Sequence, residues 1–83
     1  MDRSHLQRIV HEILVEEFEL APEAVHAGAR LGEDLELDSL DRVDLIVPLE
    51  KAVGARFVEN QLEQVRTVAD LIDAVARVTA AGT

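Results

Sequence analysis

The sequence contains no cysteine, tryptophan or tyrosine, and its aromatic residues are two phenylalanines. Without cysteine there can be no disulfide framework, no thiolate catalysis and no cysteine-ligated zinc site. The hydrophobic residues, 48% of the chain, are therefore almost entirely aliphatic. Because folding must overcome roughly 1.5 kcal/mol of conformational entropy per ordered residue, we expect most of them in one core. The length predicts a single domain over residues 1–83, too small for a large enclosed active site.

Basic residues are also scarce, with 8 Lys and Arg against 17 Asp and Glu and a formal net charge of -9. Such a chain repels nucleic acids and anionic membranes, so we expect no nucleic-acid partner. The favoured partner is a protein with a basic patch, because complementary charges speed association. For the average acidic residue, a role in solubility alone is the open alternative.

Long apolar runs are missing, since the longest covers residues 45–49 and a bilayer span needs ~20 residues. The N-terminus alternates charged and apolar residues from Asp2 onward and has no apolar signal-peptide segment. We therefore expect no membrane span and a monomeric, cytoplasmic protein.

The first helix is predicted over about residues 4–18, where apolar side chains recur at offsets of three and four. This period breaks over residues 19–37, yet apolar residues keep recurring there. We expect a long ordered loop, pinned over the helices by these residues, with a short helical turn starting near Pro22. The pinning residues are Leu20, Val25, Leu31, Leu35 and Leu37.

The second helix is predicted to begin at Asp38 or Ser39 and to end near Val53, before Gly54. Pro48 removes a backbone hydrogen bond inside it, so we expect a kink, with a break just before the proline as the alternative. Two apolar rows predict contacts with more than one neighbour, and a third line would face solvent. The rows are Leu40, Val43 and Val47, and Leu45, Leu49, Ala52 and Val53; the solvent line is Asp41, Asp44, Pro48 and Lys51.

The last helix follows Thr67 and Asp70, which have the spacing of a capping box with Asp in place of the usual Glu. Its apolar residues repeat at helical spacing to about Thr79, and a weaker segment over residues 59–65 has room for one or two further turns. Strand-like alternation is missing. The sequence therefore predicts an all-α fold, a small bundle of three to four helices with a long loop between the first two.

Ser39 lies at the predicted start of the second helix, within Asp38-Ser39-Leu40. Free N–H groups and the positive end of the helix dipole favour a phosphate ester on such a hydroxyl. An isolated Asp-Ser pair is more often only a helix cap, so the flanking residues decide the interpretation.

The flanking residues resemble those of acyl carrier proteins. The shared elements, in the family's order and spacing, are Glu33-Asp34-Leu35, Asp38-Ser39-Leu40, Asp44-Leu45, Leu49-Glu50 and Thr67-Val68, after an amphipathic first helix. The resemblance implies that Ser39 receives a covalent 4′-phosphopantetheine arm, with Asp38 and Leu40 completing the attachment site. It also implies an acyl-carrier-like bundle that is not an enzyme but a free-standing carrier of thioester-bound acyl groups.

A partner-binding surface on the second helix is also implied by the resemblance, formed by Asp41, Asp44, Val47 and Glu50. Its expected partners are a phosphopantetheinyl transferase and acyl transferases, ketosynthases or acyl ligases with basic patches. Departures from the family's pattern affect partner choice rather than the carrier role. They are Glu36 and Leu37, where the family tends to have glycine and a small residue, Arg42 and Lys51 within the acidic face, and Pro48.

Metal and hydrolase sites are disfavoured. Asp34, Glu36 and Asp38 begin like a calcium loop, but Ser39 and Leu45 stand where glycine and glutamate are needed. A Ser39 hydrolase would require a histidine base and a closed cleft. We expect no metal site. The three histidines, His5, His11 and His26, are expected to be surface or partly packed residues.

The leading hypothesis is therefore an acyl carrier of fatty-acid or polyketide biosynthesis. A peptidyl or aminoacyl carrier and an unmodified acidic helical adaptor are the alternatives. A secondary hypothesis is that acyl chains fold back between the helices, because a soft aliphatic core can open locally.

Overall fold

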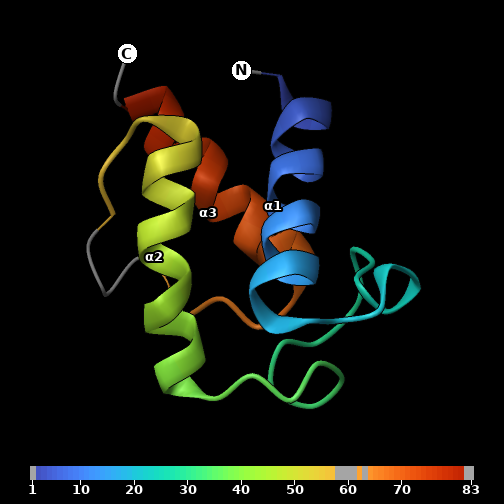
Figure 1. The fold of residues 1–83 in the computed structure, drawn as a ribbon. Coiled ribbons are helices and arrows are strands. Elements are labelled where there is room, and N and C mark those ends of the chain that lie inside the picture. The colour runs from blue at the N-terminus through green and yellow to red at the C-terminus, as the bar shows by residue number, and fades with distance from the viewer. Residues whose placement is uncertain (1, 58–61, 63, 82–83) are drawn as a thin grey trace.

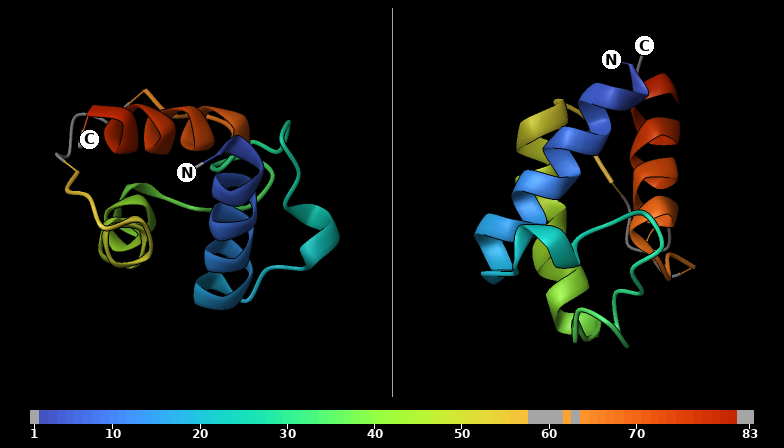
Figure 2. Two further views of the ribbon diagram at one scale, coloured as in Figure 1. Left: turned by 90° about the horizontal axis from the view of Figure 1, so that it is seen from above. Right: turned by 90° about the vertical axis from the view of Figure 1, so that its right-hand side faces the viewer.

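The computed structural model describes residues 2–57, 62 and 64–81. In chain order these form α1 (Arg3–Phe18), a single turn of 3₁₀ helix called η1 (Pro22–Ala24), α2 (Ser39–Val53) and α3 (Val68–Ala81). Helices α1 and α2 run antiparallel, and α3 crosses behind both (Figure 1, Figure 2). The all-α bundle with a long first connection is thereby confirmed, whereas the weak segment over residues 59–65 falls mostly outside the described residues.

Helix boundaries follow local caps. Asp2 accepts a hydrogen bond from the His5 N–H at 2.9 Å at the start of α1, and Gly54 ends α2 with a φ of 69°. Before α3, the Asp70 N–H donates to Thr67 Oγ1 at 3.1 Å, and the Asp70 carboxylate accepts from the Thr67 N–H at 3.2 Å. The predicted capping box is confirmed, and the predicted boundaries lie within about two residues of those observed.

Pro48 lies inside α2, which continues unbroken from Ser39 to Val53. The alternative of a helix that breaks before the proline is therefore wrong. The carbonyl that loses its partner belongs to Asp44, an exposed residue, so water can replace the missing bond. A kink at this point stays a prediction.

The core is hydrophobic throughout, since no polar or charged residue of the described part is buried. The loop between α1 and α2 shares this core: Val25, Leu31, Leu35 and Leu37 are buried and Leu20 is half-buried. The predicted ordered, pinned loop is thus confirmed.

Backbone hydrogen bonds join this loop to the start of α3. The Leu31 N–H donates to the Arg66 carbonyl at 2.8 Å, and the Val68 N–H donates to the Ala29 carbonyl at 3.0 Å. They fix the loop that leads to Ser39.

The two apolar rows of α2 differ in burial, and within the second row Leu45 and Leu49 are buried, Val53 is half-buried and Ala52 is exposed. Leu45 and Leu49 face the core, but Leu40, Val43 and Val47 are 73%, 47% and 54% exposed. The prediction that both rows contact neighbours is wrong, because α1 and α3 lie on two adjacent sides of α2 and leave its remaining surface open (Figure 2). The predicted solvent line is also only partly right: Asp44 and Lys51 are exposed, whereas Asp41 and Pro48 are half-buried.

The described helices were also compared with the requirements for a membrane span. Among the described residues, none of the helices combines the length and the hydropathy that crossing a bilayer requires.

Candidate functional site

Ser39 is the first residue of α2, and Asp38 is its N-cap. The Asp38 carboxylate accepts a hydrogen bond from the Asp41 N–H at 2.9 Å, and the Asp41 carboxylate accepts one from the Asp38 N–H at 3.1 Å. Capping is therefore done by Asp38. The exposed Ser39 side chain forms no hydrogen bond with a described residue, which leaves its hydroxyl accessible to another molecule.

Two backbone N–H groups remain at this end of α2. The first amides of a helix have no intrahelical partner, and the cap engages only that of Asp41. The N–H groups of Ser39 and Leu40 have no acceptor within the described part of the chain. A phosphate ester on Ser39 Oγ would be stabilised by these N–H groups and by the positive end of the helix dipole. The residues present thus fit a phosphate-linked group.

The loop that leads to Ser39 is held by Leu35 and Leu37, both buried. The Leu37 N–H donates to the Leu31 carbonyl at 2.8 Å. Between the two leucines, Glu36 has a φ of 57°, a left-handed conformation that costs a residue with a side chain about 1–2 kcal/mol. Glycine, which the family resemblance leads us to expect at this position, would adopt this conformation without steric cost.

An exposed face extends along α2 from the attachment position. Leu40, Asp44, Val47 and Lys51 follow one another at offsets of three and four, and all four are exposed. Clustered exposed apolar side chains are typical of interaction surfaces. The structure therefore brings together two of the residues predicted to contact partners, Asp44 and Val47, with Leu40 of the predicted attachment site.

Asp41 and Glu50, two further predicted contact residues, are half-buried and have intramolecular partners. Asp41 belongs to the cap of α2. The Glu50 carboxylate accepts a hydrogen bond from the N–H of buried Phe57 at 2.8 Å, which holds the segment after α2. Asp44 differs from both, because its carboxylate forms no hydrogen bond or ion pair with a described residue.

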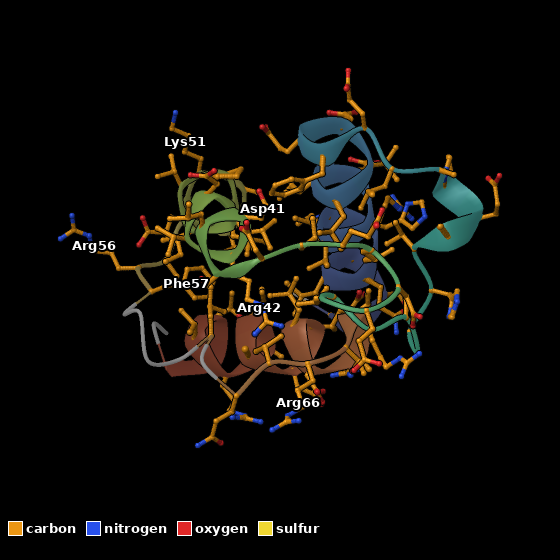
Figure 3. All side chains as sticks on the ribbon, turned by 90° about the horizontal axis from the view of Figure 1, so that it is seen from below. Asp41, Arg42, Lys51, Arg56, Phe57 and Arg66 are labelled. Carbon is orange, nitrogen blue, oxygen red and sulfur yellow. The ribbon has the colours of Figure 1, made fainter. Side chains whose placement is uncertain are left out.

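The prediction that Arg42 lies within the acidic face of the second helix is wrong. Arg42 lies half-buried and points toward α3, whereas Lys51 and Arg56 point away from the bundle (Figure 3). A signal was present, because Arg42 precedes buried Leu45 by three residues and so belongs to the covered side of α2.

Convergent metal-binding groups are not found among the described residues, where no three His, Asp or Glu side chains could hold an ion. His5 and His26 are exposed. His11 is half-buried, with its Nε2 3.0 Å from the Pro22 carbonyl oxygen. The histidines are thus surface or partly packed residues, as predicted.

Comparison with known proteins shows the family of the chain. Residues 8–75, which include Ser39, match the family model described as phosphopantetheine attachment site. The chain is 37% identical over 81 residues to "Acyl carrier protein 2" of Ralstonia nicotianae, covering 98% of this chain and 100% of that protein. It is 38% identical over 85 residues to the acyl carrier protein of Saccharopolyspora erythraea, covering 98% of this chain and 90% of the other.

A third relative, the acyl carrier protein of Thermosynechococcus vestitus, is 35% identical over 81 residues, which are 98% of this chain and 100% of that protein. Similarity of this kind extends over the helices, the long loop and the capped start of α2. The chain therefore belongs to the acyl carrier protein family, whose members are non-catalytic carriers with a phosphopantetheine attachment site.

Proposed function

We propose that Ser39 carries the phosphopantetheine arm and that the protein tethers acyl groups on it as thioesters for fatty-acid or polyketide biosynthetic enzymes. The observation that carries the proposal is the exposed Ser39 hydroxyl at the capped start of α2, next to two N–H groups without described partners. Ser4, the other serine of the chain, is also exposed near a helix start but lacks the Asp-Ser-Leu context.

Attachment of the arm would be a phosphoryl-type transfer from coenzyme A to the Ser39 hydroxyl. The Ser39 oxygen bonds to a phosphorus of coenzyme A, the pyrophosphate link to that phosphorus breaks, adenosine bisphosphate leaves, and the hydroxyl proton passes to a base of the transferase. Because the chain has no cysteine, the arm would supply the thiol that holds the acyl group.

Around the arm, the chain's own residues would position and present it. Asp38 fixes the helix start by accepting a hydrogen bond from the Asp41 N–H. The Ser39 and Leu40 N–H groups would lie next to the phosphate. The exposed face of Leu40, Asp44 and Val47 would contact partner enzymes with basic patches. Docking should be weak and fast, because an exposed charge pair contributes only ~0.2 to 1 kcal/mol but speeds encounter.

Tethering then replaces free diffusion of the substrate by a local encounter at each docked enzyme. A cytoplasmic monomer is part of this proposal. The peptidyl or aminoacyl carrier is the second candidate, whereas family membership removes the main support for an unmodified adaptor.

A loading experiment tests the attachment residue. The wild type, Ser39→Ala and the matched control Ser4→Ala are incubated with coenzyme A and a broad-specificity phosphopantetheinyl transferase, and their intact masses are measured. We expect one phosphopantetheine on the wild type and on Ser4→Ala, and none on Ser39→Ala. Modification of Ser39→Ala, or of none of the three with several transferases, would overturn the proposal.

A further inference from the structure

Pro48 leaves an open backbone acceptor on the exposed side of α2. Inside an α-helix each carbonyl accepts a hydrogen bond from the N–H four residues later, but the Pro48 nitrogen carries no hydrogen. The Asp44 carbonyl therefore loses the bond that would close this turn. The proline ring also crowds the same carbonyl, and a carbonyl on the solvent side of a helix tilts outward to find another donor. This oxygen is thus available to a group from outside the chain.

The surroundings of this carbonyl belong to the exposed face of α2. A helix carbonyl points toward the residues three and four positions later, here Val47, which is 54% exposed, and half-buried Pro48. The Asp44 side chain is exposed as well, and its carboxylate forms no hydrogen bond or ion pair with a described residue. Lys51, further along the same face, points away from the bundle (Figure 3). One residue therefore offers two oxygen acceptors to a partner, one on the backbone and one on a charged side chain.

A basic side chain fits this pair of acceptors. A guanidinium or an ammonium group has several N–H donors, so it can donate to a carbonyl and to a carboxylate at the same time. The net charge of -9 attracts such a group, and the exposed Leu40 and Val47 on either side of Asp44 offer apolar contact.

The position of Asp44 indicates which partner would supply this side chain. Asp44 follows Ser39 by five residues, which is about 7.5 Å along a helix that rises 1.5 Å per residue. An enzyme whose active site reaches the Ser39 hydroxyl must therefore cover this part of α2. The phosphopantetheinyl transferase is such an enzyme.

We propose that Pro48 is a positioning residue for the loading of Ser39, because it keeps the Asp44 carbonyl open for the transferase. One basic side chain of the transferase binds this carbonyl together with the Asp44 carboxylate. Pro48 thus weakens α2 and strengthens its recognition. Any residue with a backbone N–H at position 48 would close the helical turn and remove the acceptor. The inference rests on the proposed attachment of the arm to Ser39.

The test measures loading kinetics and stability in the same variants. Pro48→Ala and Pro48→Leu both restore the N–H, and the leucine variant also keeps a large apolar side chain. With coenzyme A and a broad-specificity phosphopantetheinyl transferase, both should raise the KM for this protein by about two- to ten-fold, the range of one hydrogen bond, with kcat unchanged. Their melting temperatures should nevertheless rise, because a proline inside a helix is destabilising. Pro22→Ala, which removes the other proline of the chain outside α2, is the control and should leave the KM unchanged.

A double-variant comparison tests whether one side chain binds both oxygens. Asp44→Asn, Pro48→Ala and the double variant are measured under the same conditions at low ionic strength. Because a single basic side chain would bind both acceptors, the KM of the double variant should rise by less than the product of the two single effects. A KM equal to that product would overturn the shared binding of the two oxygens.

Three further outcomes would contradict the inference. They are an unchanged KM in both Pro48 variants, an equal rise in Pro22→Ala, and a rise that is accompanied by lower melting temperatures, which would assign the effect to damage of α2. Absence of phosphopantetheine from the loaded wild type, seen in its intact mass, contradicts the attachment of the arm and removes the basis of the inference. Normal loading of the wild type with a KM indifferent to position 48 contradicts the inference alone.

Discussion

Glu36 adopts a backbone conformation that its residue type disfavours, only three residues before Ser39. Its φ of 57° lies in the left-handed region, while the leucines on either side are buried. Their burial holds the backbone in place, because a relaxed Glu36 would pull Leu35 or Leu37 out of the core. The family's preference for glycine at this position thus has a conformational reason, which this chain overrides.

Replacing Glu36 by glycine should therefore stabilise the protein. We expect Glu36→Gly to raise the free energy of unfolding by up to ~1 kcal/mol, because the relief of the left-handed strain exceeds the extra entropy of glycine in the unfolded chain. Urea denaturation measures the change. Glu36→Ala is the matched control, since it removes the same charge but keeps the strain, and it should gain much less. Equal gains in both variants would assign the effect to charge.

Single residues of the site were predictable to different degrees. Ser39, Asp38 and Leu40 belong to one contiguous motif, and the structure leaves the serine exposed at the helix start. The half-burial of Arg42 was missed although its spacing from Leu45 indicated it, and the hydrogen bond from the Phe57 N–H to Glu50 was not predictable. A long charged side chain can place its apolar stem against the core and its head at the rim, so charge alone does not indicate on which side of a helix it packs.

Helix α2 has one covered and one open side, and this asymmetry assigns different roles to its acidic residues. Asp41 caps the helix and Glu50 holds Phe57, so their carboxylates have partners within the chain. Asp44 lies on the open side between Leu40 and Val47, without a described partner. It should contribute most to the attraction of a basic enzyme.

Asp44→Asn should accordingly raise the KM of the phosphopantetheinyl transferase for this protein by up to about five-fold at low ionic strength, since one exposed ion pair contributes ~0.2 to 1 kcal/mol. The effect should fade as salt is added. Steady-state kinetics over a range of salt concentrations measures both. Glu16→Gln, which removes an exposed acid from α1, is the control and should leave the KM unchanged. A KM that rises equally in both variants would show that only net charge matters.

The start of α3 depends on the ionised form of Asp70. Hydrogen bonds from the backbone N–H groups of Arg66 and Thr67 hold the pKa of the Asp70 carboxyl below its usual value. A lowered folded-state pKa contributes stability that is present above the unfolded value near 3.9 and is lost as the pH falls through the folded pKa.

Asp70→Asn should therefore destabilise the protein at neutral pH by about 1 kcal/mol, the usual cost of a lost cap. The difference from the wild type should shrink below about pH 4, where Asp70 is protonated first in the unfolded state, and should vanish once the pH is below the lowered folded-state pKa. Urea denaturation at several pH values checks this. Asp44→Asn, at an exposed position within α2, serves as the control and should cost much less throughout. A cost that stays constant down to strongly acid pH would contradict the role of the ionised carboxylate.

At the level of elements, the ends of the helices were predictable, whereas the side of α2 that its neighbours cover was not. Helical periodicity and capping residues such as Thr67 and Gly54 act locally, so they place helix ends within a few residues. Which apolar row of α2 a neighbour covers depends on where α1 and α3 lie, and spacing within α2 carries no such information. Val47 was therefore assigned both a core contact and a partner contact, and only its exposure separates the two.

For the whole molecule, the net charge of -9 is large relative to its size. The longest axis is 33 Å, close to the Debye length of about 30 Å at 0.01 M salt, so at that ionic strength acidic residues repel one another across the fold. At 0.1 M the Debye length is about 10 Å and most of this repulsion is screened.

The melting temperature should consequently rise when the ionic strength is raised from about 0.01 M to about 0.1 M, and divalent cations should act at lower concentrations. Thermal unfolding followed by circular dichroism measures the shift. The control replaces three exposed acids of α1 by glutamine, namely Glu12, Glu16 and Glu17. Its formal net charge is -9 + 3 = -6, so its melting temperature should rise less with added salt. Indifference of the wild type to salt would contradict this electrostatic description.

The central claim is that Ser39 is the residue to which the arm is attached. Protease digestion of loaded wild-type protein, followed by fragmentation mass spectrometry, locates the arm directly and needs no variant. We expect the phosphopantetheine on Ser39, with the peptide that contains Ser4 unmodified. An arm on Ser4 or on a threonine, or loaded protein whose Ser39 peptide is unmodified, would contradict the claim.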